Sequence, residues 1–146
     1  MNHPSCEIIP LDRYNWELCL KIEIHESQRA FTPSILHSLA QAKFEALTPY
    51  GLVYQGEMIG FLMYGTFGGI CWINRIIIDR KYQGKGLGTA ALKLILRKLR
   101  NYTDCKEIRT SYAEENRAAE RLFSANGFVP MASALDDGEV VMRYQG

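Results

Sequence analysis

The chain has 146 residues and a formal net charge of +1, with 47% hydrophobic and 23% charged residues, as in ordinary globular proteins. This length suits one domain over residues 1–146 with a single core, and the near-neutral charge argues against a nucleic-acid-binding protein. Because the sequence has no apolar run long enough to span a membrane and no secretion signal at its N-terminus, we expect a cytoplasmic protein without a membrane partner.

Strands and helices follow one another along the whole chain. The strands are expected over residues 7–10, 52–55, 58–64, 73–79 (starting near residue 70), 107–112, 128–129 and 139–144. The helices are expected over residues 13–26, 34–46, 87–100 and 116–126. Asp12 and Thr32 are the predicted caps of the first two helices, and Gly127 ends the last one. This order predicts an α/β fold in which about four helices flank a mixed sheet of about seven strands.

The region 72–99 carries the most informative pattern, in which a buried strand enters a glycine-rich turn and then an amphipathic helix. Such a turn lets main-chain N–H groups point inward. The helix that follows adds unpaired donors and a partial positive charge, so the whole motif is suited to bind an anion. The dinucleotide fingerprint fails, because Thr89 stands where its third glycine belongs, and no P-loop pattern occurs. A tight glycine turn without a ligand is the alternative.

Two motifs resemble those of the GNAT family of N-acetyltransferases. Residues 83–88, QGKGLG, match the family's Q/R-x-x-G-x-G/A signature, and residues 116–128 are similar to its N-x-x-A-x-x-L-Y-x-x-x-G-F pattern. The resemblance covers nearly the whole chain and implies the GNAT fold, acetyl-CoA as co-substrate and acetyl transfer to an amine. Residues 60–65 and 79–88 look most like bacterial spermine/spermidine acetyltransferases, so a polyamine is the favoured small-molecule acceptor.

The resemblance also implies where the cofactor binds. In GNAT proteins the strand before the turn splays from its neighbour and its backbone binds the pantetheine arm, while the turn grips the pyrophosphate. The positions that match are Ile76, Ile77, Ile78, Gln83, Gly84, Lys85, Gly86, Leu87, Gly88, Thr89, Asn116, Ala119 and Phe123. Lys85 suits a phosphate contact and a solvated loop position equally well. Asn116 suits a helix cap as well as a pantetheine contact.

Two residues depart from the family pattern where proton transfer is expected. Phe123 replaces the family's tyrosine acid and cannot donate a proton, so Tyr112, at the end of a strand, is the expected substitute. Asn74 stands where polyamine acetyltransferases of the family often carry a carboxylate, so the candidate bases are Glu26 and Glu23. The alternatives are a half-buried strand tyrosine and two solvated helix carboxylates.

Three functions stay open on the sequence alone. Beside a polyamine acetyltransferase, these are a GNAT enzyme for another amine (an amino acid, an aminoglycoside-like amine or a protein N-terminus) and an acyl-CoA-binding sensor with little turnover. We expect the loops 27–31, 66–69 and 132–138 to shape the acceptor pocket. The closing hairpin offers an edge strand through which a homodimer could form. The four cysteines are scattered and do not cluster with the histidines, so we expect reduced thiols and no metal.

Overall fold

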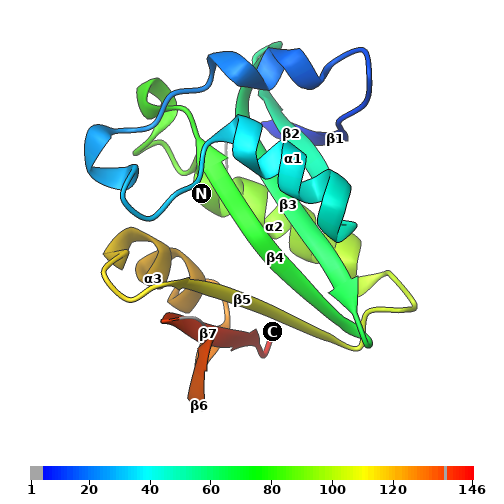
Figure 1. Ribbon diagram of the computed structural model, residues 1–146, viewed down its shortest axis with the longest axis vertical. Helices are drawn as coiled ribbons and strands as arrows, with labels where there is room; N and C mark the ends of the chain where they lie inside the picture. The colour runs from blue at the N-terminus through cyan, green and yellow to red at the C-terminus, as the bar shows by residue number, and fades with distance from the viewer. Residues whose placement is uncertain (1–4, 137) are drawn as a thin grey trace.

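The computed structural model describes residues 5–136 and 138–146 (Figure 1). In this part of the chain the strands are β1 (Cys6–Pro10), β2 (Thr48–Tyr54), β3 (Glu57–Phe67), β4 (Ile70–Ile78), β5 (Glu107–Ala113), β6 (Phe128–Asp136) and β7 (Glu139–Tyr144). The α-helices are α1 (Ile35–Glu45), α2 (Leu87–Arg100) and α3 (Arg117–Ser124). Short 3-10 helices form η1 (Trp16–Lys21), η2 (Glu26–Gln28) and η3 (Arg80–Tyr82).

The strands form one mixed sheet, as predicted, in the order β1-β2-β3-β4-β5-β7-β6. β4 and β5 are parallel, and the other neighbouring pairs are antiparallel. The parallel pair needs a crossover, which α2 supplies. Figure 1 shows α1 on one face of the sheet and α2 on the other. None of the described helices combines the length and the apolar character that a membrane span requires.

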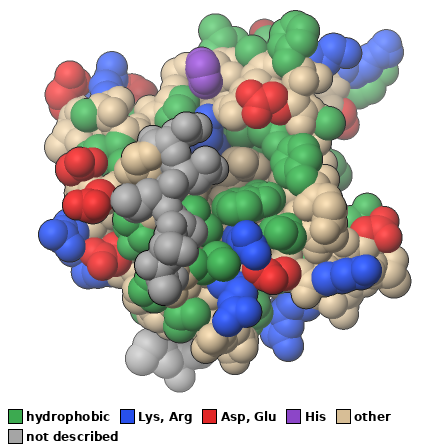
Figure 2. Space-filling view, turned by 60° about the horizontal axis from the view of Figure 1, so that its bottom comes forward, with side chains coloured by type: hydrophobic (Ala, Val, Ile, Leu, Met, Phe, Trp, Pro, Cys, Tyr) green, Lys and Arg blue, Asp and Glu red, His purple; other side chains and the backbone are tan. Residues whose placement is uncertain are grey.

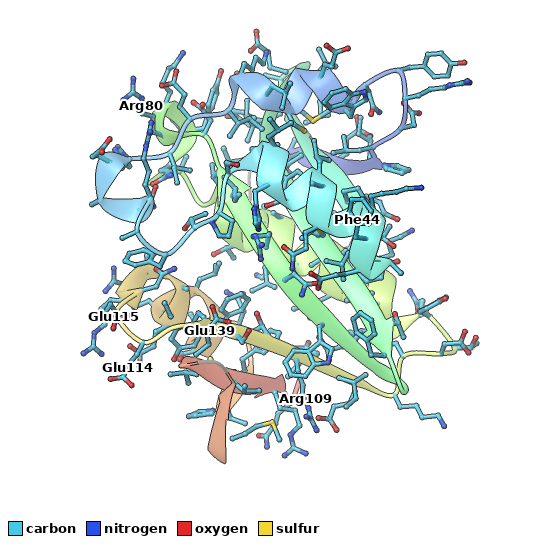
Figure 3. All side chains as sticks on the ribbon, in the orientation of Figure 1. Phe44, Arg80, Arg109, Glu114, Glu115 and Glu139 are labelled. Carbon is cyan, nitrogen blue, oxygen red and sulfur yellow. The ribbon has the colours of Figure 1, made fainter. Side chains whose placement is uncertain are left out.

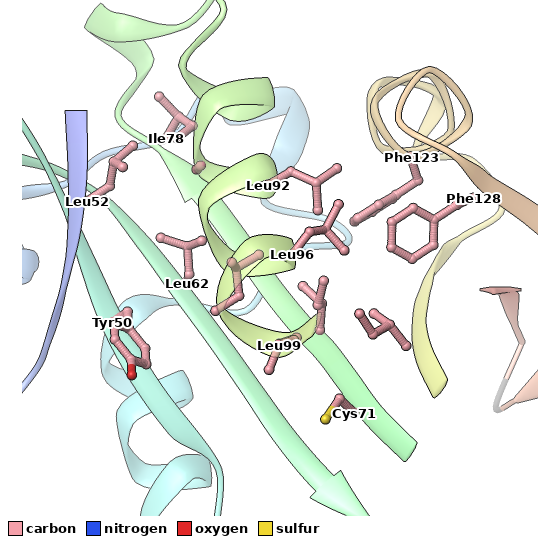
Figure 4. Close-up of a cluster of buried hydrophobic side chains, with 14 of the residues drawn as sticks. Tyr50, Leu52, Leu62, Cys71, Ile78, Leu92, Leu96, Leu99, Phe123 and Phe128 are labelled. Atoms are coloured by element: carbon pink, nitrogen blue, oxygen red, sulfur yellow. The ribbon is translucent and has the colours of Figure 1, made fainter. Parts of the chain in front are cut away.

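Both faces of the sheet are covered by apolar side chains. The buried residues of α2 pack on one face, together with Phe123 of α3 and side chains of β2 to β5 (Figure 4). η1 and α1 pack on the other face through Cys19, Ile35 and Ala42, which contact Phe61 of β3 and further buried side chains. The periodic apolar stripe of α2 explains why its predicted bounds, 87–100, agree with the structure.

The helix predicted over residues 13–26 is wrong. The chain forms only the 3-10 helix η1 there and turns extended at Ile22, whose ψ is 126°. The backbone of Glu23 is engaged elsewhere, since its N–H donates to the Asp79 carboxylate at 2.9 Å and its carbonyl accepts from the Arg80 N–H at 2.7 Å. A backbone bonded to a distant segment cannot also form helical hydrogen bonds, so tertiary pairing overrides the local pattern.

The remaining differences concern the ends of elements. Ser34, and not Thr32, caps α1, because its Oγ accepts the N–H of His37 at 3.0 Å. β2 starts at Thr48, before the predicted residue 52, and β6 continues to Asp136, beyond the predicted residue 129. β6 is an edge strand of the sheet, so the homodimer suggested for this edge stays a prediction.

Candidate active site

β4 and β5 form a fork. Residues 70–73 of β4 pair with 107–110 of β5, and the ladder stops there. The hydroxyl of Thr110 donates to the carbonyl of Ile73 at 2.9 Å at this last pair. Beyond it, no described residue of β5 pairs with β4, so residues 74–78 turn one backbone edge toward the opening that Figure 1 shows between the two ribbons. Such an edge can bind an extended ligand as if the ligand were an added strand.

Asn74 is the extra residue of a β-bulge at the base of this fork. Arg75 lies opposite Met63 and Ile73 lies opposite Tyr64, so Asn74 has no partner on β3. Its Oδ1 atom is buried, and no described residue donates a hydrogen bond to it. A buried acceptor without a donor costs about 1–3 kcal/mol. A bound molecule that brings a donor into the fork would remove that cost.

Arg75 ties helix α1 to the bulge. Its guanidinium donates to Ser38 Oγ at 3.1 Å, to Gln41 Oε1 and to the carbonyl of Asn74 at 3.1 Å. Burial lowers the pKa of Arg75, and the negative charge of Glu139 opposes this effect. The guanidinium therefore supplies a donor to the carbonyl at the bulge and holds α1 against β4.

The glycine turn is anchored at the end of β4. Asp79 is buried, and its carboxylate accepts the N–H of Glu23 at 2.9 Å. Gln83 donates from Nε2 to the carbonyl of Ile78 at 2.8 Å and to Gln28 Oε1 at 3.1 Å. Because these contacts come from two separate segments, the turn is held in place before any ligand binds.

The turn leads directly into the N-terminus of α2. Gly84 and Gly86 have left-handed backbones, with φ of 76° and 80°, a conformation that side chains disfavour. The first intrahelical hydrogen bond runs from the Ala90 N–H to the Gly86 carbonyl at 3.0 Å. The N–H groups of Leu87, Gly88 and Thr89, in the first turn of the helix, therefore have no acceptor within the helix. These donors and the positive end of the helix dipole create an anion-binding site.

α3 lies beside the start of α2. A Cβ atom on Gly88 would lie 4.0 Å from the methyl groups of Leu122 on α3. Asn116 caps α3, because its Oδ1 accepts the N–H of Ala119 at 3.2 Å. The cap predicted for Asn116 is therefore present, whereas its contact with a cofactor stays a prediction. Lys85 is exposed, which fits both of its alternatives.

Phe123 and Tyr112 lie in the core on the α2 face of the sheet. Phe123 is buried and meets Phe128 edge to face, with ring centroids 5.2 Å apart. Tyr112 is buried two positions beyond the last β4–β5 pair. Burial raises the pKa of Tyr112, the Glu120 charge raises it further, and the Arg117 charge opposes both. The phenol therefore keeps its proton at neutral pH.

The two candidate bases lie on the segment that packs beside the glycine turn. The Glu26 side chain is 91% exposed, and its carboxylate is 3.5 Å from Arg29 Nε. The Glu23 carboxylate is 3.8 Å from the Arg80 guanidinium. Both are solvated, as in the alternative interpretation of these residues.

Two residues on the α1 face of the fork were not anticipated from the sequence. The Ser111 hydroxyl donates to Glu139 Oε1 at 2.8 Å. Thr110 and Tyr112 are buried on the α2 face, so the alternation along β5 turns Ser111 to the opposite face. Glu139 begins β7 opposite Ala113, which places it on that same face. The alternation was visible in the sequence, but the pairing of β7 with β5 was not.

Figure 2 shows basic and acidic side chains around an apolar area on one face of the molecule. Arg109 of β5 forms an ion pair with Glu107 and lies over the ring of Trp72, 5.7 Å from its centroid. The charge of Arg109 is therefore already matched within the protein.

The loops predicted to shape the acceptor pocket are only partly described. Loop 66–69 lies at the start of β4, where β4 and β5 are still paired, and the side chains of 132–137 are outside the described residues.

Among residues 5–136 and 138–146, no group of three His, Cys, Asp or Glu side chains could hold a metal ion. The cysteines are free, and burial raises the pKa of Cys19 to about 11 and that of Cys105 to about 12. Such thiols are poor nucleophiles at neutral pH.

Comparison with known proteins identifies the family. The family described as "Acetyltransferase (GNAT) family" matches residues 13–128 of the chain. This protein belongs to the GNAT acetyltransferase family. It is 36% identical to the spermine/spermidine N(1)-acetyltransferase of Bacillus subtilis (strain 168), over 84% of this chain and 87% of that protein. It is 29% identical to an aminoglycoside N(6')-acetyltransferase type 1 of Klebsiella pneumoniae, over 81% of this chain and 63% of that protein.

Solved structures share the fold of this GNAT acetyltransferase. AAC(6')-Ib in complex with ribostamycin and coenzyme A superposes with a TM-score of 0.79 at 18% identity, over 96% of this chain and 93% of that chain. This superposition confirms the predicted fold. The family match confirms the N-acetyltransferase class and, with it, acetyl-CoA as the co-substrate. The roles of individual residues stay predictions.

Proposed function

We propose that this GNAT acetyltransferase transfers the acetyl group of acetyl-CoA to a primary amine of a polyamine such as spermidine or spermine. The relative named a spermine/spermidine N(1)-acetyltransferase supports this acceptor, since 87% of its length aligns at 36% identity. The aminoglycoside acetyltransferase aligns over only 63% of its length at 29% identity. An aminoglycoside-like amine is therefore the second candidate acceptor.

The observation that carries the activity is the fork that opens directly before the glycine turn. The free backbone edge of residues 74–78 suits an extended pantetheine arm, and the N–H groups of residues 83–89 suit a pyrophosphate. Acetyl-CoA, when bound, supplies an acetyl group activated as a thioester. In this proposal, Asn116 and Ala119 at the start of α3 flank the path of the cofactor and Phe123 forms an apolar wall, a role that the burial of Phe123 supports.

Tyr112 is the proposed acid. Its phenol is protonated at neutral pH and can give a proton to the departing sulfur, although burial raises its pKa and so makes it a weaker acid than an ordinary tyrosine. A thiol with a pKa of ~8.5 can also leave unprotonated, so loss of this donor should slow the reaction without abolishing it. Glu26 is the proposed base. Because its side chain is highly exposed, Glu26 would take the proton of the amine through water.

A steady-state assay with acetyl-CoA and a panel of amines tests the proposal. Release of free thiol should be fastest with spermidine or spermine. Turnover with an aminoglycoside or an amino acid alone would refute the polyamine acceptor. Acetyl-CoA binding in calorimetry without turnover of any amine would favour the acyl-CoA sensor.

We also retain the cytoplasm as the proposed location. The described cysteines are free thiols, which suits a reducing compartment.

A further inference from the structure

Glu139 begins β7 opposite Ala113, at the end of β5 where the fork is open. It lies on the α1 face of the sheet, opposite to the face on which Tyr112 and Phe123 are buried. Figure 3 shows it beside β5, apart from Glu114 and Glu115, which follow the end of that strand. The alternation along β5 and the position of Glu139 at the start of β7 both follow from strand pairing, so this placement is fixed by the sheet.

The Glu139 carboxylate is oriented by a hydrogen bond, and it forms no ion pair with a described residue. The Ser111 hydroxyl donates to one of its oxygens at 2.8 Å, which fixes the side chain. None of the ion pairs between described residues involves Glu139. The charge of Arg75 is near enough to attract that of Glu139, but the guanidinium gives its hydrogen bonds to the neutral groups of Ser38, Gln41 and the Asn74 carbonyl, and none to the Glu139 carboxylate.

A second polar group, at the base of the same fork, lacks a hydrogen-bond partner among the described residues. The Asn74 Oδ1 atom is buried and has no donor among the described residues. A carboxylate that forms no ion pair with a described residue and a side-chain amide oxygen without a described donor can both accept hydrogen bonds from positively charged N–H groups. An alkylammonium group offers such N–H groups.

We propose that Glu139, oriented by Ser111, binds the ammonium group of the acceptor, and that it supplies the negative charge which the amide of Asn74 lacks. This inference rests on the proposed function and specifies its acceptor as a cationic amine. Glu139 is then a specificity-determining residue, and Ser111 is the positioning residue that acts through it.

The test compares Glu139→Gln with the wild type. The amide keeps an oxygen for the Ser111 hydroxyl but removes the charge, so the fold is retained. Since hydrogen bonds to charged groups are the stronger class, the KM for spermidine should rise about tenfold, with a smaller change in kcat. The affinity for spermidine of the protein saturated with coenzyme A should fall by the same factor in calorimetry.

Glu115→Gln is the matched control. Glu115 is an exposed carboxylate near the end of β5, so its loss changes the net charge equally but leaves the fork intact. It should leave the KM for spermidine unchanged. Added salt should weaken spermidine binding more in the wild type than in Glu139→Gln, because only the wild type has the ion pair.

Failure of this inference differs from failure of the proposed function. Equal KM and equal spermidine affinity in Glu139→Gln and the wild type, with turnover intact, would overturn the role of Glu139 alone. If the wild type acetylates another amine but not spermidine, the polyamine proposal fails, and the same comparison with that amine decides on Glu139. If no amine is acetylated, spermidine affinity in calorimetry still decides, since loss of affinity in Glu139→Gln supports the site and no difference rejects it.

Discussion

Gly84 and Gly56 offer a matched pair for testing the anion site. Both have a φ of 76°, and a Cβ atom on either would meet no other atom within 4 Å. Alanine at either position therefore pays the same backbone strain, about 1–2 kcal/mol, and causes no clash in the folded protein. Gly84 lies in the turn before α2, whereas Gly56 lies in the hairpin between β2 and β3. Only the first should matter for the cofactor.

The strain predicts the stability of both variants. For a domain of this size, 1 kcal/mol lowers Tm by roughly 2–4 °C, so Gly84→Ala and Gly56→Ala should each melt about 2–8 °C below the wild type. The affinities of Gly84→Ala and Gly56→Ala for the cofactor should differ. A methyl group and a shifted backbone among the turn donors should weaken acetyl-CoA binding by about tenfold or more in Gly84→Ala, a change of ~1.4 kcal/mol. Isothermal calorimetry on the three proteins measures this. Equal Kd values for the two variants would refute the placement of the pyrophosphate at residues 83–88.

Three further substitutions separate structural from functional roles. Tyr112→Phe should slow turnover about tenfold or more at neutral pH with unchanged acetyl-CoA affinity. Because burial raises the Tyr112 pKa, the wild type should lose this advantage only when the pH rises above the ordinary pKa of tyrosine. Equal rates of the variant and the wild type at every pH would exclude Tyr112 as the acid. Asn116→Ser keeps a capping oxygen and should melt like the wild type, so weaker acetyl-CoA binding would identify a cofactor contact and unchanged binding a cap only. Gly88→Ala should be neutral or stabilising by up to about 1 kcal/mol, since its Cβ only reaches van der Waals contact with Leu122. Its acetyl-CoA affinity should nevertheless fall, and unchanged affinity would show that the cofactor does not pass between α2 and α3.

The sequence pattern predicted α2 correctly because the signals that specify this helix lie within a single short stretch of the chain. The apolar stripe of α2 and the glycines before it specify a helix start, and the helix begins at Leu87 as expected. The helix expected over 13–26 failed for the opposite reason. Its apolar spacing fits a helix, but the bonds that Asp79 and Arg80 make to Glu23 come from residues more than fifty positions away. No window of sequence contains both partners.

The fork likewise has one part that the sequence predicted and one part that it did not. Its position on β4 followed from the family resemblance, whereas the end of the ladder at Ile73 and Thr110 depends on the distant strand β5. The bulge at Asn74 depends on the register between β3 and β4, which the apolar pattern of these strands does not reveal. Glu139 escaped prediction because its neighbour Ser111 is brought to it by the pairing of β5 with β7. Long-range pairing thus determined the part of the site that the sequence could not reveal.

The two faces of the fork differ in how sequence change affects them. The proposed cofactor side uses main-chain groups, which depend on strand register and on left-handed glycines and are preserved through most side-chain substitutions. The proposed acceptor side uses the side chains of Glu139 and Ser111, which a single substitution can alter without disturbing the sheet. An enzyme built this way can change its acceptor while it keeps its acetyl donor. If the proposal holds, relatives named for polyamines and for aminoglycosides differ on the acceptor side while they share one fold, and the residues on the α1 face should decide the acceptor of this chain.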